Sequence, residues 1–397
     1  MNQALSKGAS SLAVVPLAPH VGLYIHIPFC LHKCSYCDFF SITLMSAQLL
    51  ESYTNALLEE IRQKSMWGQT FEIDTIYFGG GTPSLLSGKQ LARIIKIIHN
   101  EFMVNDQAEI SIEANPGTLD EKKIKEFIDA GINRLSLGVQ SFADKDLRVL
   151  SRIHNSYDVM VVIENLHKLE LKNFNIDLIY GIPGQNIKGW IKNLGLAVDC
   201  SPKHISTYLL QLDASTPMAR DVKEGILELL DEDAEWAMYN HTIEYLLKSG
   251  FEHYEISNFC RPGFECKHNL IYWQAREYIG IGTGAVSFID AHRYMNKKNI
   301  QEYLNRMQNG VSCLTEELEH MNCNSLVIDA IILGLRLCRG ISIKEFEQRF
   351  GINIESEYYG IILDYNNKGL LKLKDGYLRL TKSGYFLSNE VLCGFID

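Results

Sequence analysis

Short apolar runs alternate with longer amphipathic segments over the first half of the chain. Strands are predicted at Tyr24–Pro28, Thr75–Gly79, Glu109–Ala114, Arg134–Val139, Phe174–Tyr180 and His204–Leu210. Helical periodicity marks the segments between them, at 46–65, 88–102, 119–130, 156–170 and 186–199. Repeated strand–helix units imply a parallel sheet with right-handed crossovers. The pattern therefore predicts an α/β protein with a partial, TIM-like (β/α)6 barrel.

The regular alternation of strands and helices does not continue in the second half of the chain. A helix is predicted over 231–249, a strand over Tyr254–Phe259, and a glycine-punctuated stretch follows at Tyr278–Gly284. Helices near 323–338, 342–350 and 354–368 then precede Leu370–Thr381, a predicted two-stranded wing that turns at Asp375-Gly376. We expect four parts: a leader at 1–20, the barrel at 21–250, a connecting region at 251–312, and a smaller α+β, winged-helix-like domain at 313–397.

Bulk composition narrows the class of protein. The formal net charge is −10 over 397 residues, which argues against a nucleic-acid partner. No apolar run reaches the ~18 residues of a membrane span, and prolines interrupt Ser11–Phe29, so no signal peptide is predicted. The expected location is the cytoplasm, with a peripheral association at the inner membrane face left open. In that reducing compartment the ten cysteines should be thiols or metal ligands.

Three cysteines form a C-x3-C-x2-C run directly after the first predicted strand: Cys30, Cys34 and Cys37. Three thiolates can hold three corners of a [4Fe–4S] cubane and leave the fourth iron open to the amino and carboxylate groups of a methionine moiety. The alternatives are buried thiols or a Cys3His zinc site that uses His26 or His32. Cys260 and Cys266, near His268, are either ordinary thiols or part of a second metal site.

Polar residues lie in or just after the predicted barrel strands, where apolar surroundings require that they have partners. Glu113 and Gln140 end the third and fourth strands, Arg152 follows the fourth, and Asp177 lies inside the fifth. They either bind a charged sulfonium with ribose hydroxyls or form self-satisfied ion pairs. Gly79-Gly80-Gly81-Thr82-Pro83 ends the second strand, where glycines let a backbone approach a ligand or simply make a tight turn.

These motifs, and much of the chain from about 21 to 390, resemble the radical SAM family that contains oxygen-independent coproporphyrinogen III oxidase and the haem chaperone HemW. The resemblance implies a [4Fe–4S] cluster on Cys30, Cys34 and Cys37. It implies that the glycine element binds the amino group of S-adenosylmethionine (SAM). The cofactor-binding residues that it implies are Tyr24, Tyr36, Gly80, Gly81, Thr82, Glu113, Gln140, Arg152 and Asp177. A flavodoxin or ferredoxin reductant would be required.

Two features separate the members of that family. The oxidase has a fourth cysteine where this chain has Phe39, and a longer N-terminal segment; both departures argue against decarboxylase activity. His268-Asn269-Leu270-Ile271-Tyr272-Trp273 resembles the H-N-x-x-Y-W pattern of HemW. A neutral His268 would suit haem iron as an axial ligand, with Tyr272 and Trp273 stacked on the porphyrin. The alternatives are a structural histidine among core aromatics, or Cys266 as the ligand.

We therefore expect a haem chaperone that binds haem, the cluster and SAM and transfers haem to apo-haemoproteins such as respiratory cytochromes. The alternative is oxidative decarboxylation of coproporphyrinogen III to protoporphyrinogen IX. A radical SAM enzyme that opens or methylates another substrate, and a structural zinc protein, are further alternatives. Homodimer formation stays open.

Overall fold

The structure is a computed structural model that describes residues 20–68, 71–311 and 315–396. The expected leader lies outside these residues except for His20. Two compact units are present. The larger contains His20–Tyr272 and Arg276–His320, and the smaller contains Trp273–Ala275 and the chain from Met321 onward.

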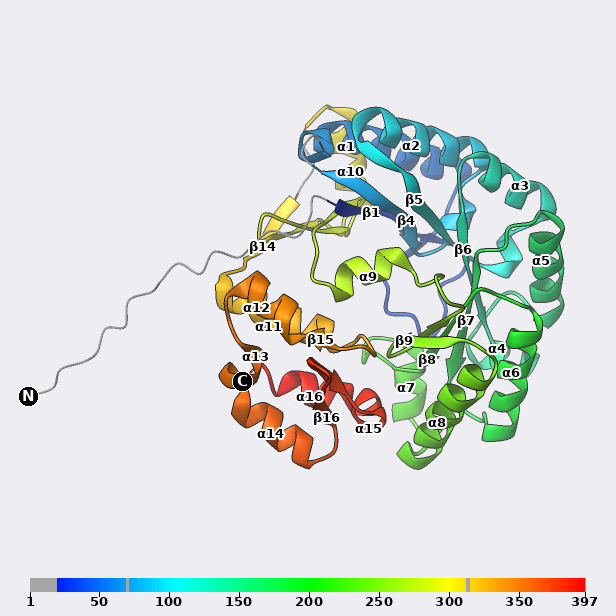
Figure 1. The fold of residues 1–397 in the computed structure, drawn as a ribbon. Coiled ribbons are helices and arrows are strands. Elements are labelled where there is room, and N and C mark those ends of the chain that lie inside the picture. Colours follow the sequence, from blue (N-terminus) through cyan, green and yellow to red (C-terminus); the bar gives the residue numbers. More distant parts are fainter. Residues whose placement is uncertain (1–19, 69–70, 312–314, 397) are drawn as a thin grey trace, which may run out of the picture. The chain divides into compact units, whose positions relative to one another are not determined.

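The larger unit is built on one sheet whose central strands are parallel, which confirms the expected α/β class and the partial barrel (Figure 1). Along the sheet, the parallel strands are β11 (Tyr278–Ile281), β1 (His20–Ile27), β4 (Glu72–Gly80), β5 (Met103–Ala114), β6 (Arg134–Gln140), β7 (Phe174–Tyr180) and β8 (His204–Leu209). Six of these strands match the predicted units. Nearly every side chain of β7 is buried, as the apolar run predicts for a strand covered on both faces.

The sheet continues beyond the predicted barrel at both edges. Strand β11 pairs in parallel with β1, in the stretch that the sequence showed only as a run of glycines. A Cβ at Gly280 would lie 2.1 Å from the carbonyl oxygen of Val286, so glycine is what lets β12 (Val286–Ile289) pack against it. Antiparallel β13 (His292–Asn296) and β14 (Thr315–His320) complete this edge.

At the other edge, the prediction of one strand over Tyr254–Phe259 is wrong. The chain turns at Ile256-Ser257 and gives two short antiparallel strands, β9 (Glu252–Glu255) and β10 (Asn258–Cys260). Tyr239 fixes the turn, because its hydroxyl donates to the Ile256 carbonyl at 3.0 Å.

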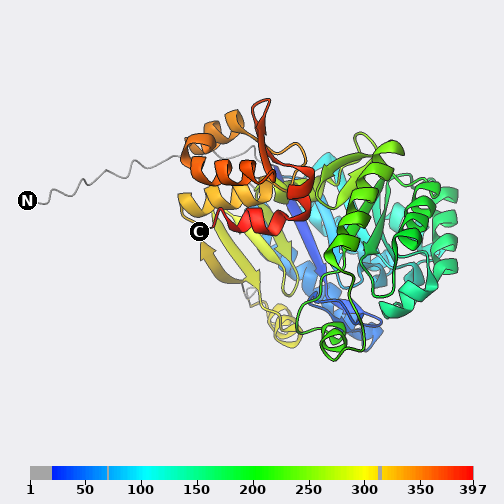
Figure 2. The same ribbon diagram turned by 90° about the horizontal axis from the view of Figure 1, so that it is seen from below.

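Helices follow the strands along the chain: α1 (Ala47–Gly68), α2 (Gly88–Glu101), α3 (Glu121–Asp129), α4 (Asp144–Val149), α5 (Ser156–Lys168), α6 (Ile187–Asp199), α7 (Pro217–Lys223), α8 (Glu232–Lys248) and α10 (Ile300–Gln308). Figures 1 and 2 show α2, α3, α5 and α6 on the outer side of the curved sheet, whereas α9 (Lys267–Trp273) lies on its inner side. Helix α2 begins with a Ser87–Gln90 capping box and buries its predicted apolar stripe.

The smaller unit contains α11 (Cys323–Gly334), α12 (Ile343–Phe350), α13 (Ile354–Glu357), α14 (Tyr359–Asn367), α15 (Lys382–Phe386) and α16 (Ser388–Cys393). Its sheet has the order β15 (Ile341–Ser342), β17 (Tyr377–Leu380), β16 (Leu371–Lys374). The hairpin turns at Asp375-Gly376, both with positive φ, as predicted. The helix predicted over 354–368 is broken at Tyr358, which leaves the helical region with φ −106° and ψ 25°.

Across the described segments, no helix has the length and apolar character needed to cross a membrane.

A buried ion pair joins α1 to the β11 edge of the sheet. Lys64 lies 2.9 Å from Glu60, whose side chain is fully buried. The Glu60 carboxylate also accepts hydrogen bonds from the Gly282 amide, the Asn296 side chain and the Tyr303 hydroxyl. The cluster is satisfied on all sides, so removal of one member leaves a buried charge without compensation.

Lys64→Met should lower the free energy of unfolding by about 3–5 kcal/mol, because the Glu60 carboxylate loses its cation. Urea unfolding followed by far-UV circular dichroism measures the effect. As a matched control, Lys125→Met breaks the exposed Lys125–Asp129 pair and should cost no more than about 0.5 kcal/mol. Equal effects of the two substitutions would contradict the assignment.

Candidate cofactor site

The loop with the three cysteines is tied at its base. Cys30 ends β2 (Phe29–Cys30), which pairs with β3 (Ile42–Thr43) on the far side of the loop. The Ile42 amide donates to the Pro28 carbonyl at 2.7 Å, and the Leu44 amide to the Cys30 carbonyl at 2.8 Å. The cysteines are thus held beyond the C-terminal end of β1, the end where the active sites of such barrels gather.

The three thiols lie close enough to affect one another. Burial raises the pKa of the Cys37 thiol, and the neighbouring Cys34 and Cys30 thiols raise it further. Hydrogen-bond donors point at two of the sulfurs: Thr82 Oγ1 is 3.6 Å from Cys30 Sγ, and Arg152 Nη1 is 3.5 Å from Cys34 Sγ. Gathered thiols with donors to the sulfurs fit an iron–sulfur cluster, whose potential such hydrogen bonds tune.

The zinc alternative that uses His26 fits less well. Its Nε2 is 3.0 Å from the Phe40 carbonyl oxygen and its Nδ1 is 3.0 Å from the Tyr24 hydroxyl. Both ring nitrogens are therefore engaged away from the thiols. His32 is exposed on the loop itself.

The glycine element packs directly against the cysteine loop. A Cβ at Gly81 would lie 3.0 Å from Cys30 Sγ and 2.7 Å from the Phe29 carbonyl oxygen. Gly80 has φ +117°, and a Cβ there would lie 2.7 Å from the His26 ring. A side chain would fill the space at both positions, so the end of this strand exposes backbone groups alone. We call Gly80 and Gly81 the glycine cradle.

The Glu113 carboxylate ends β5 beside that cradle. It accepts hydrogen bonds from the Tyr77 hydroxyl at 2.9 Å and from the Gly80 amide at 3.2 Å. Burial raises its pKa to about 7, and the charge of Asp177 adds to the shift. Neither hydrogen-bond partner carries a charge, so the ionised carboxylate suits a cationic ligand.

Asp177 lies inside the barrel among hydrogen-bond donors. Ser136 Oγ donates to it at 2.9 Å and Asn175 Nδ2 at 2.7 Å. Burial raises the pKa of its carboxyl, while hydrogen bonds from Ser206, Ser136 and Asn175 oppose the shift.

Gln140 and Arg152 complete the wall. Gln140 has φ +64°, in the left-handed region, at an irregularity in the pairing of β6 with β7. Such strain is often kept at ligand sites. The Arg152 guanidinium donates to the Gly138 carbonyl at 3.0 Å and to Asn115 Oδ1, and the Tyr36 phenol lies beside it.

Nearly all of the residues expected from sequence line one cavity of about 470 Å³. Its wall includes Cys30, Cys34, Tyr36, Cys37, Gly80, Gly81, Thr82, Glu113, Gln140, Arg152 and Asp177. Tyr24 and His268 are not among the described lining residues. Tyr24 lies behind the wall, with its ring 6.3 Å from that of Tyr77. Cys266 reaches the cavity, and burial raises the pKa of its thiol to about 12.

Sequence reasoning missed several polar lining residues: Tyr77, Asn115, Arg134, Ser136, Asn175, His204 and Ser206. Most are every second residue of a strand, as in Asn175-x-Asp177 and His204-x-Ser206. That period of two, with polar residues inside otherwise apolar runs, is the signal that would have found them.

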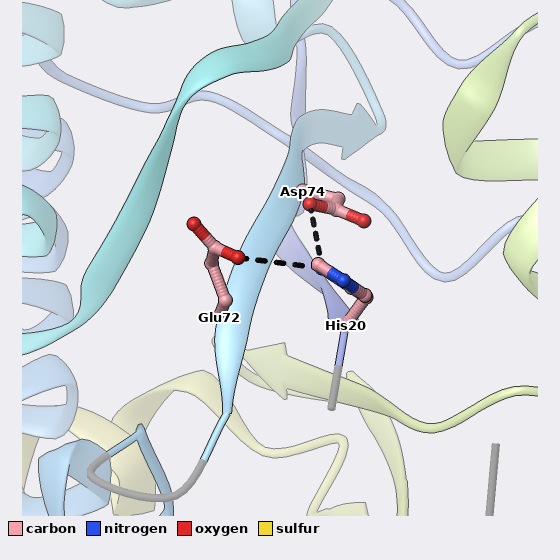
Figure 3. Close-up of side chains that lie close together, drawn as sticks. All are labelled: His20, Glu72 and Asp74. Atoms are coloured by element: carbon pink, nitrogen blue, oxygen red, sulfur yellow. Dashed lines mark hydrogen bonds and ion pairs between the residues drawn. The ribbon is translucent and has the colours of Figure 1, made fainter. Parts of the chain in front are cut away.

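A second ligand-like group lies elsewhere, near the starts of β1 and β4 (Figure 3). His20 Nδ1 is 3.1 Å from Asp74 Oδ1 and 3.5 Å from Glu72 Oε2. All three side chains are partly exposed, and a hydrogen bond between His20 and Asp74 accounts for the geometry. It lies at the ends of the strands opposite to the cysteine loop.

Comparison with known families agrees with this geometry. The Radical SAM superfamily model matches residues 24–197, and the HemN C-terminal domain model matches residues 327–387. The crystal structure of coproporphyrinogen III oxidase (HemN) from Escherichia coli has the same fold, with a TM-score of 0.82 at 22% identity over 97% of this chain and 91% of that one. Barrel, cysteine loop and cavity together define a radical SAM protein.

The similarity to curated relatives is more specific. Heme chaperone HemW of Lactococcus lactis is 36% identical, with 94% of this chain and 96% of the relative covered. Heme chaperone HemW of Bacillus subtilis is 34% identical over 94% and 98%, and that of Escherichia coli is 37% identical over 67% and 70%. The chain belongs to the HemW family of radical SAM proteins.

Cys30→Ala should abolish the brown visible absorbance of the anaerobically reconstituted protein, because one iron corner loses its thiolate. Iron and sulfide analysis checks the loss. Cys393→Ala, at an exposed cysteine of the smaller unit, should retain full iron content. Retention of the absorbance in Cys30→Ala would refute the ligand assignment.

Glu113→Gln should stabilise the SAM-free protein much more at pH 8 than at pH 5. The folded-state pKa of about 7 exceeds the ordinary 4.5, so the folded state holds a proton that the unfolded chain has released. Stability is therefore present at low pH and is lost as pH rises through 7, by at most ~3 kcal/mol. Urea unfolding at both pH values measures it, with the exposed Glu164→Gln as control. A gain at pH 5 equal to that at pH 8 would contradict the shifted titration.

Proposed function

We propose that this protein is a haem chaperone that binds haem, a [4Fe–4S] cluster and SAM, and transfers haem to apo-haemoproteins such as respiratory cytochromes. The observation that carries the proposal is the similarity to proteins named heme chaperone over nearly the whole of both chains. Phe39 adds to it, since it occupies the position where the oxidase members of the family have a fourth cysteine.

In this proposal Cys30, Cys34 and Cys37 hold the cluster, and the cavity beside them holds SAM. The residues at the cavity are matched to the molecule. The bare backbone at Gly80 and Gly81 and the Glu113 carboxylate suit an ammonium group, while Asp177 and Gln140 suit ribose hydroxyls. The Arg152 guanidinium, whose Nη1 is 3.5 Å from Cys34 Sγ, would suit a carboxylate. A bound cluster with SAM supplies one-electron chemistry.

The chain's own part in that chemistry is to bind, orient and exclude water. Arg152 is fixed by the Gly138 carbonyl and by Asn115, so its charge stays beside the cluster loop. Leu210, Ile179 and Met218 form a buried apolar cluster against which Tyr36 packs. This apolar backing limits the access of water to the loop from that side.

The second candidate is oxygen-independent coproporphyrinogen III oxidase, favoured by the closely similar fold of that enzyme. The oxidase would decarboxylate coproporphyrinogen III, whereas the chaperone would release haem unchanged to an apo-haemoprotein. Either function would use an electron donor of the flavodoxin or ferredoxin class.

Cluster-reconstituted protein titrated anaerobically with haem should show saturable binding with a shifted Soret band. The loaded protein, added to an apo-haemoprotein, should lose that band as the acceptor gains its own. Protein without added haem is the control. Carbon dioxide and protoporphyrinogen formed from coproporphyrinogen III with SAM and reductant, without saturable haem binding, would favour the oxidase and overturn the chaperone.

A further inference from the structure

The segment Cys266–Tyr272 carries most of the H-N-x-x-Y-W element and lies inside the barrel; we call it the plug. Helix α9 lies on the inner side of the sheet (Figure 1). Its first amide, of Lys267, donates to Glu109 Oε1 at 3.0 Å. Glu109 and Glu113 are four residues apart on β5, so both carboxylates face the interior. The strand that carries the cavity carboxylate therefore also anchors the plug.

His268 is enclosed and fully engaged in this position. Its side chain is 1% exposed. Nδ1 lies 2.7 Å from Thr75 Oγ1 on β4, and Nε2 lies 2.9 Å from the Tyr272 hydroxyl. A Cβ on Gly22 of β1 would lie 3.1 Å from the imidazole Cε1, so the ring is also confined from the strand side.

An axial haem ligand needs a free nitrogen lone pair and room for the porphyrin above it. Here the ring is neutral, because burial lowers the pKa of His268 to about 3, but both nitrogens already have partners. Ligation through His268 would require one of two short hydrogen bonds to break and the plug to leave the barrel.

Among the ring contacts of His268, the one with Tyr77 leads to the cofactor cavity. It stacks on Tyr77, with centroids 5.0 Å apart and an angle of 18° between the planes. The Tyr77 hydroxyl in turn donates to Glu113 Oε1 at 2.9 Å. Tyr77 lines the cavity and His268 does not, so His268 supports the side chain that supports Glu113.

We propose that His268 is a positioning residue for SAM: it fixes the Tyr77 ring, and through it the Glu113 carboxylate, and so sets the affinity for the ammonium end of the cofactor. His268 then lies behind the lining of the cofactor cavity and is not the haem ligand. This inference rests on the assignment of Glu113 to SAM, and it leaves haem binding to another surface.

The test is a double-mutant cycle on the anaerobic, cluster-reconstituted full chain, with the SAM dissociation constant measured by equilibrium dialysis. His268→Ala and Tyr77→Phe should each weaken SAM binding about 10-fold or more, as the loss of supporting contacts does elsewhere. The double variant should be no weaker than Tyr77→Phe alone, because His268 acts through Tyr77. Independent structural roles would instead give multiplied effects.

Two milder variants keep the test valid where His268→Ala fails to fold. His268→Asn keeps an amide near Nδ1 for Thr75 but loses the ring that stacks on Tyr77, so it should still weaken SAM binding. Thr75→Val removes only the hydroxyl that meets Nδ1 and should weaken SAM binding with cluster content unchanged. Unchanged SAM affinity in Thr75→Val and His268→Ala, or multiplied effects in the cycle, would overturn the proposal, as would the absence of SAM binding by the wild-type holoprotein.

Haem titration of the same preparations separates this inference from the proposed function. The Soret band of haem-loaded His268→Asn should match that of the wild type. Loss of the band in this variant, with wild-type haem binding intact, would make His268 the ligand and overturn the positioning role. If the wild type binds no haem while the SAM cycle behaves as expected, the chaperone function fails and the positioning role stands.

Discussion

The buried carboxylate of Glu113 is the constraint around which the larger unit is arranged. Its two partners, the Tyr77 hydroxyl and the Gly80 amide, are neutral, and burial raises its pKa to about 7. At neutral pH the fold therefore holds a negative charge at a cost in stability. In the proposed function a cationic ligand would offset that cost, so the same buried carboxylate would favour a molecule with an ammonium group.

Other polar side chains inside the barrel satisfy one another through hydrogen bonds, in a network centred on Asn175. The Asn175 amide nitrogen donates to Ser136, Asp177 and Ser206, and its carbonyl oxygen accepts a hydrogen bond from the His204 ring Nδ1. Such closed networks are rigid. Parallel strands provide them, because every second side chain of each strand enters the same space. Glu113 is not part of this network; among the described residues it accepts hydrogen bonds from the Tyr77 hydroxyl and the Gly80 amide.

The sequence predicted what depends on local patterns. The apolar run of β7 and the spacing of Cys30, Cys34 and Cys37 lead directly to the barrel wall and the cysteine loop. The sequence did not reveal β11, because a four-residue strand that contains Gly280 is too short to show an alternation of buried and exposed side chains. It also did not reveal which side of the sheet α9 occupies. A short aromatic helix has the same pattern on either side, and only the fit of His268 above Gly22 and against Tyr77 decides it.

The pairing of β2 with β3 has a consequence for the supply of iron. The hydrogen bonds at the base of the cysteine loop, at Pro28 and Cys30, join backbone groups and use no cysteine sulfur. The base of the loop is therefore closed by groups that are not metal ligands, which lowers the conformational entropy that metal binding would cost. In small zinc domains, by contrast, binding and folding are one event. A loop closed in this way would keep its shape when its metal is lost, and would be able to take up metal again without refolding.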